Sequence, residues 1–168
     1  MGTVRRFFKH VFTTGGAARR AFPQATLDAI QALIGDGETR HRAQLKLIIE
    51  PALDWSDLLD GTSSRARAHA LFSRYRIWDT AENCGVLVYI NLADHKVEIV
   101  TDRGVGAAVQ HAEWETACRL MTQGFGQGKF HDSVLAGVAH VNVQLEESFP
   151  DNGSRERGNE VSDRPVLL

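Results

Sequence analysis

Oxygen-bearing side chains cluster beside two apolar runs near the middle of the chain. Before the first run stand Asp79, Glu82 and Asn83, with Gly85 at its start, and after the second run stand Asp102, Arg103 and Gly104. Carboxylate and amide oxygens from more than one loop are the ligands that a hard divalent cation prefers. This pattern predicts a site for calcium or magnesium with Asp79, Asn83 and Asp102 as ligands.

A structural interpretation of the same residues stays open. Asp79 and Asn83 can hydrogen-bond the backbone of their own loop, as short polar side chains often do in turns. Asp102 and Arg103 can form an exposed pair that contributes about 0–1 kcal/mol to stability. The cation hypothesis therefore depends on whether the two loops meet in space.

Three apolar segments predict the strands that place these loops. The strands are expected at about 44–50, 85–92 and 96–101, and a helix is expected from Ser63 or Ser64 to about Tyr75. A strand, helix and strand in succession predict parallel strands joined by a right-handed crossover. The short connection 93–95 forces the third strand antiparallel to the second. The loop before the second strand and the exit of the third then lie at one end of the sheet, opposite Glu50, Asn91 and Asp94.

Further helices are predicted on either side of these strands. Apolar residues recur at helical spacing over 23–41, 112–120 and 132–147, with a glycine-rich break at 124–128. The segment 54–62 reads as irregular. The fold class is therefore α/β, a small mixed sheet of at least three strands flanked by helices on both faces.

Two sequence runs resemble a known family. The residues from Trp78 to Tyr89 read W-D-T-A-E-N-C-G-V-L-V-Y, and those from Val97 to Gly104 read V-E-I-V-T-D-R-G. These runs resemble the short soluble bacterial branch of the TPM-domain family, which is related to the thylakoid acid-phosphatase-like TPM proteins. The resemblance spans about 21–150 and implies a Rossmann-like sandwich. It also implies calcium binding or acid-phosphatase activity at the loops that carry Asp79, Asn83, Gly85 and Asp102 to Gly104.

Two functions from different classes follow. The first is a non-enzymatic module that binds a divalent cation, a protein partner or both through Asp79–Asn83 and Asp102–Gly104. The second is a metal-dependent phosphatase that hydrolyses phosphomonoesters, with Arg103 stabilising the developing charge. The module is favoured because no nucleophile or base stands out in these loops.

Composition and charge limit the other classes of function that the protein could have. The 168 residues carry a net charge of −2, so no basic excess favours nucleic acid. Cys84 and Cys118 form no C-x-x-C motif or disulfide framework, and no apolar run is long enough to span a membrane. A cytoplasmic protein is expected, with catalytic residues unknown.

The chain divides into a basic arm at 1–20, a TPM-like domain at 21–150 and a polar tail at 151–168. The arm is expected to dock loosely, with contact to a membrane surface or a membrane-associated partner as the alternative. Residues 1–15 and 151–158 are expected to lack stable contacts, while docking of 159–168 is left open. Trp78 and Trp114 are expected in the core.

Overall fold

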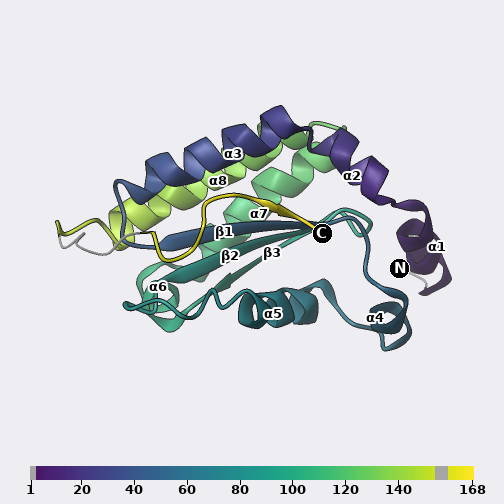
Figure 1. Ribbon diagram of the computed structural model, residues 1–168, viewed down its shortest axis with the longest axis horizontal. Helices are drawn as coiled ribbons and strands as arrows, with labels where there is room; N and C mark the ends of the chain where they lie inside the picture. Colours follow the sequence, from purple (N-terminus) through teal and green to yellow (C-terminus); the bar gives the residue numbers. More distant parts are fainter. Residues whose placement is uncertain (1–2, 154–158) are drawn as a thin grey trace.

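A four-stranded mixed sheet forms the centre of the molecule (Figure 1). The structure is a computed structural model that describes residues 3–153 and 159–168. The strands are β1 (Gln44–Glu50), β2 (Gly85–Asn91), β3 (Lys96–Thr101) and β4 (Val166–Leu167), in the order β3-β2-β1-β4. The three predicted strands are confirmed, and the fourth comes from the tail.

The strand directions place the loops as the sequence predicts. β1 runs parallel to β2 over its whole length, with Gln44 opposite Gly85 and Glu50 opposite Asn91. β3 is antiparallel to β2, so Thr101 lies opposite Val86 at the end of the sheet where β2 begins. We call this end, where β1 and β2 begin and β3 ends, the loop end, and the other the carboxyl end.

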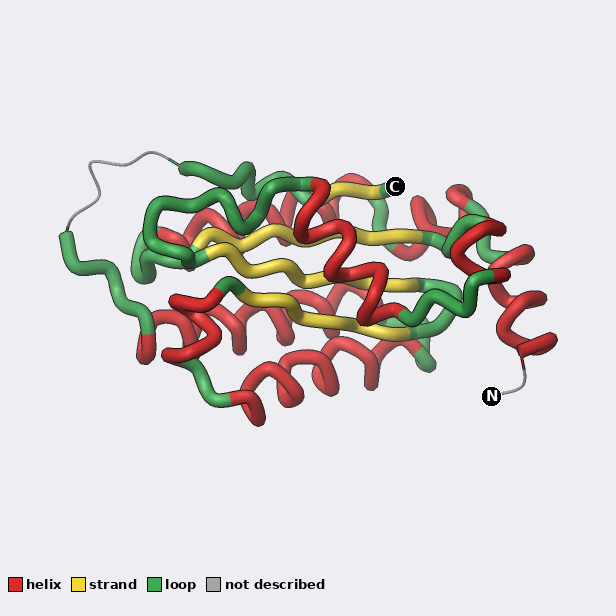
Figure 2. Tube along the Cα trace, turned by 90° about the horizontal axis from the view of Figure 1, so that it is seen from below, coloured by secondary structure: helices red, strands yellow, loops and turns green. Residues whose placement is uncertain are grey.

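Eight described helices surround the sheet. They are α1 (Thr3–Phe12), α2 (Gly15–Ala21), α3 (Gln24–Glu38), α4 (Trp55–Leu59), α5 (Ser64–Arg74), α6 (Arg103–Ala108), α7 (His111–Phe125) and α8 (Phe130–Ser148). α3, α7 and α8 cover one face, and α5 crosses the strands on the other (Figures 1 and 2). The predicted α/β class with helices on both faces is therefore confirmed. Segment 54–62, predicted as irregular, contains the short helix α4. In the described part of the chain, no helix has the length and apolarity needed to cross a membrane.

The alternation of side chains along β1 divides the core into two layers. Leu45, Leu47 and Ile49 pack in the larger cluster, which includes α3, α7 and α8. Ile48 packs in the smaller cluster with Leu71 of α5. One face of β1 is therefore apolar, whereas the other carries Ile48 between the buried polar side chains of Lys46 and Glu50. Trp114 is buried as predicted.

Both ends of the chain contact the rest of the molecule more closely than expected. The Arg6 side chain donates to the Thr62 carbonyl over 2.9 Å, and the His10 ring accepts from the Leu53 amide over 2.9 Å. The prediction that 1–15 make no stable contacts is wrong for these described residues, because polar side chains anchor α1 where its apolar surface alone would not. Residues 1–2 and 154–158 lie outside the described residues.

The C-terminal segment docks beside β1. The Lys46 ammonium donates to the carbonyls of Ser162 and Arg164, each over 2.7 Å, and Leu168 N donates to Ile49 O over 3.0 Å. Burial lowers the pKa of Lys46, and Asp163 partly offsets this effect. The tail therefore adds an edge strand, which answers the question that the sequence left open.

Candidate functional site at the loop end

The two predicted loops meet through their backbones. Gly104 N donates to Asn83 O over 3.0 Å, and Asp102 N donates to Gly85 O over 2.9 Å. A Cβ on Gly104 would lie 2.7 Å from Asn83 O and 2.8 Å from Glu82 O, so only glycine permits this approach. The predicted convergence of the loops is confirmed.

Asp102 occupies the centre of this junction. It is the N-cap residue of α6, and its Oδ1 accepts from Arg103 N over 2.7 Å. Its Oδ2 is buried and has no hydrogen-bond partner among the described residues. A buried carboxylate oxygen without a partner is costly in free energy, and a bound cation is one way to compensate it.

Asp79 and Asn83 are less well placed as ligands. Both are exposed, and Asn83 adopts a left-handed backbone with φ of 52°. Their backbone amides bond within the loop, Asp79 N to Arg76 O over 2.9 Å and Asn83 N to Thr80 O over 3.2 Å. Their backbones are thus held by the loop, while their side chains remain accessible to solvent.

The residues at the edge of the predicted site differ in role. Glu82 pairs with Arg42, whose guanidinium also lies 4.1 Å from the centre of the Phe149 ring. Arg103 is exposed, and no ion pair with it occurs in the described part of the chain. A Cβ on Gly85 would approach Ile77 O to 1.8 Å, so this glycine serves packing. Glu82 and Gly85 are therefore structural here.

The described residues contain no group of three or more His, Cys, Asp or Glu side chains arranged to hold a metal ion. Any cation at this end would need amide, backbone or water oxygens besides Asp102. Calcium accepts such mixed oxygen ligands.

Sequence reasoning missed Glu160 as a neighbour of the loop. Its carboxylate accepts from Ala81 N over 3.2 Å, and Gln44 Oε1 receives the amides of Glu160 and Val161 over 2.8 and 3.0 Å. The only signal was the resemblance of the terminal residues to the family, which gives no position in space. Glu160 thus holds the C-terminal segment against the loop that precedes β2.

Neither cysteine is suited to nucleophilic chemistry. Burial raises the pKa of the Cys84 thiol, although Thr80 partly opposes this effect. Burial likewise raises the pKa of Cys118 to about 11. Both thiols are therefore protonated at neutral pH.

The carboxyl end of the sheet holds a buried polar network. Glu50 is 4 % exposed and accepts from Arg67 Nη2 over 2.5 Å and from Tyr89 OH over 2.5 Å. Asn91 Nδ2 donates to Tyr89 OH over 3.3 Å. Burial, followed by the neighbouring Glu50, raises the pKa of Tyr89 well above its usual range. The phenol is therefore a stable donor to the carboxylate.

Asp94 joins this end to α1. Its side chain is 4 % exposed and lies 3.0 Å from Arg6 Nη2 and 3.2 Å from His10 Nε2. Burial alone would raise the pKa of Asp94, but the hydrogen bonds from Arg6 and the adjacent His10 ring outweigh it and hold the pKa below its usual value. The polar groups at the carboxyl end thus anchor the N-terminal helix.

The prediction that Trp78 lies in the core is wrong, because this residue is 49 % exposed beside Asp79. The loop after α5 turns its indole outward, while Ile77, which is fully buried, fills the core at this point. The loop end therefore presents an aromatic surface next to its acidic residues.

Comparison with known proteins agrees with this fold. The NMR structure of BA42 protein from the psychrophilic bacterium Bizionia argentinensis sp. nov. is similar, with a TM-score of 0.69 and 22 % identity over 86 % of this chain and 93 % of that chain. No curated protein matches the sequence. The family model of the TPM domain matches residues 18–144, which include both loops and all three long strands. This chain belongs to the TPM domain family.

Proposed function

We propose that this protein is a TPM-type module that binds a divalent cation at the loop end. The observation that carries the proposal is the buried Oδ2 of Asp102, which lacks a partner among the described residues at the point where the loops meet. Asn83 and Asp79 lie on the adjoining loop with accessible oxygens. Calcium is the preferred ion because it accepts carboxylate, amide and carbonyl oxygens in flexible geometry, and magnesium is the alternative.

The test is a calcium titration followed by amide NMR spectra. We expect shifts at 79–85 and 101–105 in the wild type and at least a tenfold weaker response in Asp102→Asn. Asparagine keeps the N-cap of α6, so this variant removes charge and not the cap. Asp60→Asn is the matched control, since Asp60 is an exposed C-cap residue of α4. An absence of shifts with millimolar calcium or magnesium, or an unchanged affinity in Asp102→Asn, would contradict the proposal.

The second ligand that we propose for this end is a protein partner. Trp78 supports it, because it is an exposed indole and tryptophan is enriched at protein contact sites. A photo-crosslinking amino acid in place of Trp78 should give adducts in cells, and the same substitution at Leu59, which is 77 % exposed, is the control. Equal adducts from both positions would count against a specific contact.

Phosphomonoester hydrolysis is the alternative activity. Arg103 supports it, since an exposed guanidinium adjacent to a bound cation could stabilise a phosphoryl group. Turnover of para-nitrophenyl phosphate should then require calcium or magnesium and fall in Arg103→Gln. Turnover that is independent of added cation would exclude this mechanism.

A further inference from the structure

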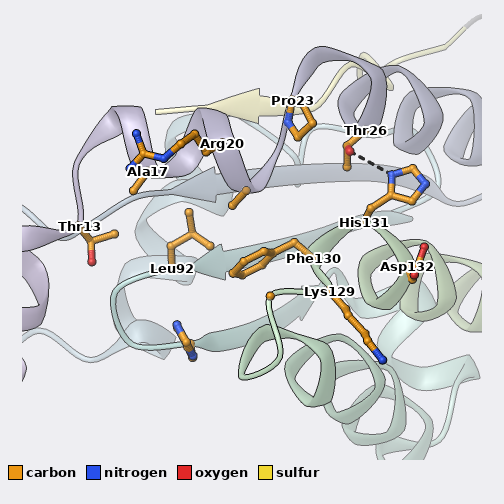
Figure 3. Close-up of a pocket in the computed structure, with 13 residues that line it drawn as sticks. Thr13, Ala17, Arg20, Pro23, Thr26, Leu92, Lys129, Phe130, His131 and Asp132 are labelled. Carbon is orange, nitrogen blue, oxygen red and sulfur yellow. Dashed lines mark hydrogen bonds between the residues drawn. The ribbon is translucent and has the colours of Figure 1, made fainter.

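A cavity of about 720 Å³ opens at the carboxyl end, far from the predicted loops. α2, the start of α3, the residue that follows β2 and the start of α8 surround it (Figure 3). The residues that matter here are Ala17, Arg20, Leu92, Lys129, Phe130 and His131. In sheets with parallel strands, ligands bind outside the carboxyl ends of those strands, and this volume is typical of small-molecule sites.

The inner wall of the cavity is apolar and well supported. Phe130 and Leu92 lie at its centre (Figure 3). The Phe130 ring packs 5.1 Å from that of Phe125 and 5.7 Å from that of Phe22, measured between ring centres. These contacts hold the aromatic wall in place without a ligand. An apolar group of a ligand can therefore bury its surface here.

The rim of the cavity carries positive charge. Arg20 and Lys129 are both exposed, and neither forms an ion pair within residues 3–153 and 159–168. The acidic lining residue Asp132 lies on the same side of Phe130 as Lys129, away from Arg20 (Figure 3). Burial lowers the pKa of the lining residue His95, and the charge of Lys9 adds to this effect, so its imidazole is neutral at pH 7. Two cations against one carboxylate favour an anionic ligand.

Backbone and hydroxyl groups add polar contacts. The 19-residue helix α8 begins at Phe130, a lining residue, with no side-chain cap, so its N-terminus brings a partial positive charge beside the cavity. Thr26 Oγ1 lies 3.0 Å from His131 Nδ1, which orients the imidazole at the far wall. A few polar groups around an apolar wall are the usual composition of a ligand site.

We propose that this cavity binds a small organic anion. Its apolar part packs on Leu92 and Phe130, and its carboxylate or phosphate is drawn to the positive rim, where Arg20 is the cation on the side away from Asp132. This site is separate from the cation site, so either proposal can fail without the other.

The test uses phenylacetate and phenyl phosphate as probes, with 2-phenylethanol as the neutral counterpart and inorganic phosphate as the anion without a ring. Binding to the full chain is measured by amide NMR and calorimetry with EDTA present, so that cation-dependent hydrolysis is suppressed. We expect both aromatic anions, or one of them, to bind at least fivefold more tightly than 2-phenylethanol, and the stronger one identifies the anionic group. Equal binding of the neutral probe, or equal binding of inorganic phosphate, would overturn the proposal.

Two pairs of variants locate the site. Arg20→Gln should weaken the binding of the aromatic anions about fivefold or more, because a charge-assisted contact is lost. Arg19→Gln removes the same charge from the same helix but faces a different groove, so it should leave binding unchanged. Ala17→Leu should fill part of the cavity and weaken the binding of every aromatic probe about tenfold. The control Ala112→Leu, on α7, should leave binding unchanged. Unchanged binding in both Arg20→Gln and Ala17→Leu, with native amide spectra, would exclude this cavity.

Discussion

At the carboxyl end of the sheet, Glu50 and Asp94 are each held by an arginine, whereas at the loop end Asp102 keeps one buried oxygen without a described partner. All three carboxylates adjoin the strands and are wholly or partly buried, yet their surroundings differ in charge. Removing one partner of a buried ion pair is strongly destabilising, whereas an unpaired carboxylate leaves capacity for a ligand. The contrast suggests that the network of the carboxyl end serves stability and Asp102 serves binding.

The same change, from carboxylate to amide, tests this contrast at each position. Glu50→Gln should have the largest effect and lower the free energy of unfolding by about 3 kcal/mol, because Arg67 would lose its buried partner. Urea denaturation measures this value. Tyr89→Phe, which removes only one hydrogen bond, should cost about 1 kcal/mol and serves as a graded control. A loss below that of Tyr89→Phe would contradict the stabilising role of the pair.

Asp94→Asn should have an intermediate effect of about 1–2 kcal/mol, since Arg6 remains partly exposed and keeps its bond to the Thr62 carbonyl. α1 should then detach, which faster amide exchange in residues 6–12 would report. Unchanged exchange there would show that Asp94 does not anchor the helix.

Asp94 also makes the stability of the protein depend on pH. The pKa of Asp94 is lower in the folded protein than its unfolded value, which is about 3.9. Its contribution to stability is therefore complete above the unfolded pKa and is lost as the pH falls through the folded pKa. The difference between wild type and Asp94→Asn should be constant from pH 7 to about pH 5 and shrink below about pH 4. A constant difference at pH 3 would contradict this linkage.

Asp102→Asn should have the smallest effect, within about 0.5 kcal/mol in the absence of cations, because no described partner of Oδ2 is lost and the N-cap is kept. With calcium present, the wild type should gain stability and the variant should not. A loss comparable with that of Asp94→Asn in EDTA would indicate a structural role for Asp102 instead.

Local patterns in the sequence predicted much of the fold. The bounds 44–50 and 96–101 match β1 and β3, and Ser63 caps α5 with its hydroxyl accepting from Ala66 N over 3.1 Å. These features depend on neighbouring residues, through side-chain alternation and capping chemistry. The meeting of the loops followed from strand order alone, because a crossover and a tight turn leave one arrangement.

Other features required contacts between distant residues. Trp78 was expected in the core, but only the packing of Ile77 shows that its neighbour faces solvent. Glu82 belonged to the predicted site, but its pairing with Arg42 joins residues 40 positions apart. Such pairings depend on where chain segments are brought together, which residue type does not reveal.

The sequence by itself determined the three long strands, the main helices, the family and the end of the sheet where the two loops lie. The tertiary structure decided which carboxylates are paired, how α1 and the tail dock, and where a cavity opens beside Arg20 and Phe130. The physical reason is the distance along the chain over which each interaction acts. Periodicity and caps act over a few residues, whereas charge pairing, burial and cavities depend on surfaces assembled from segments far apart in the chain.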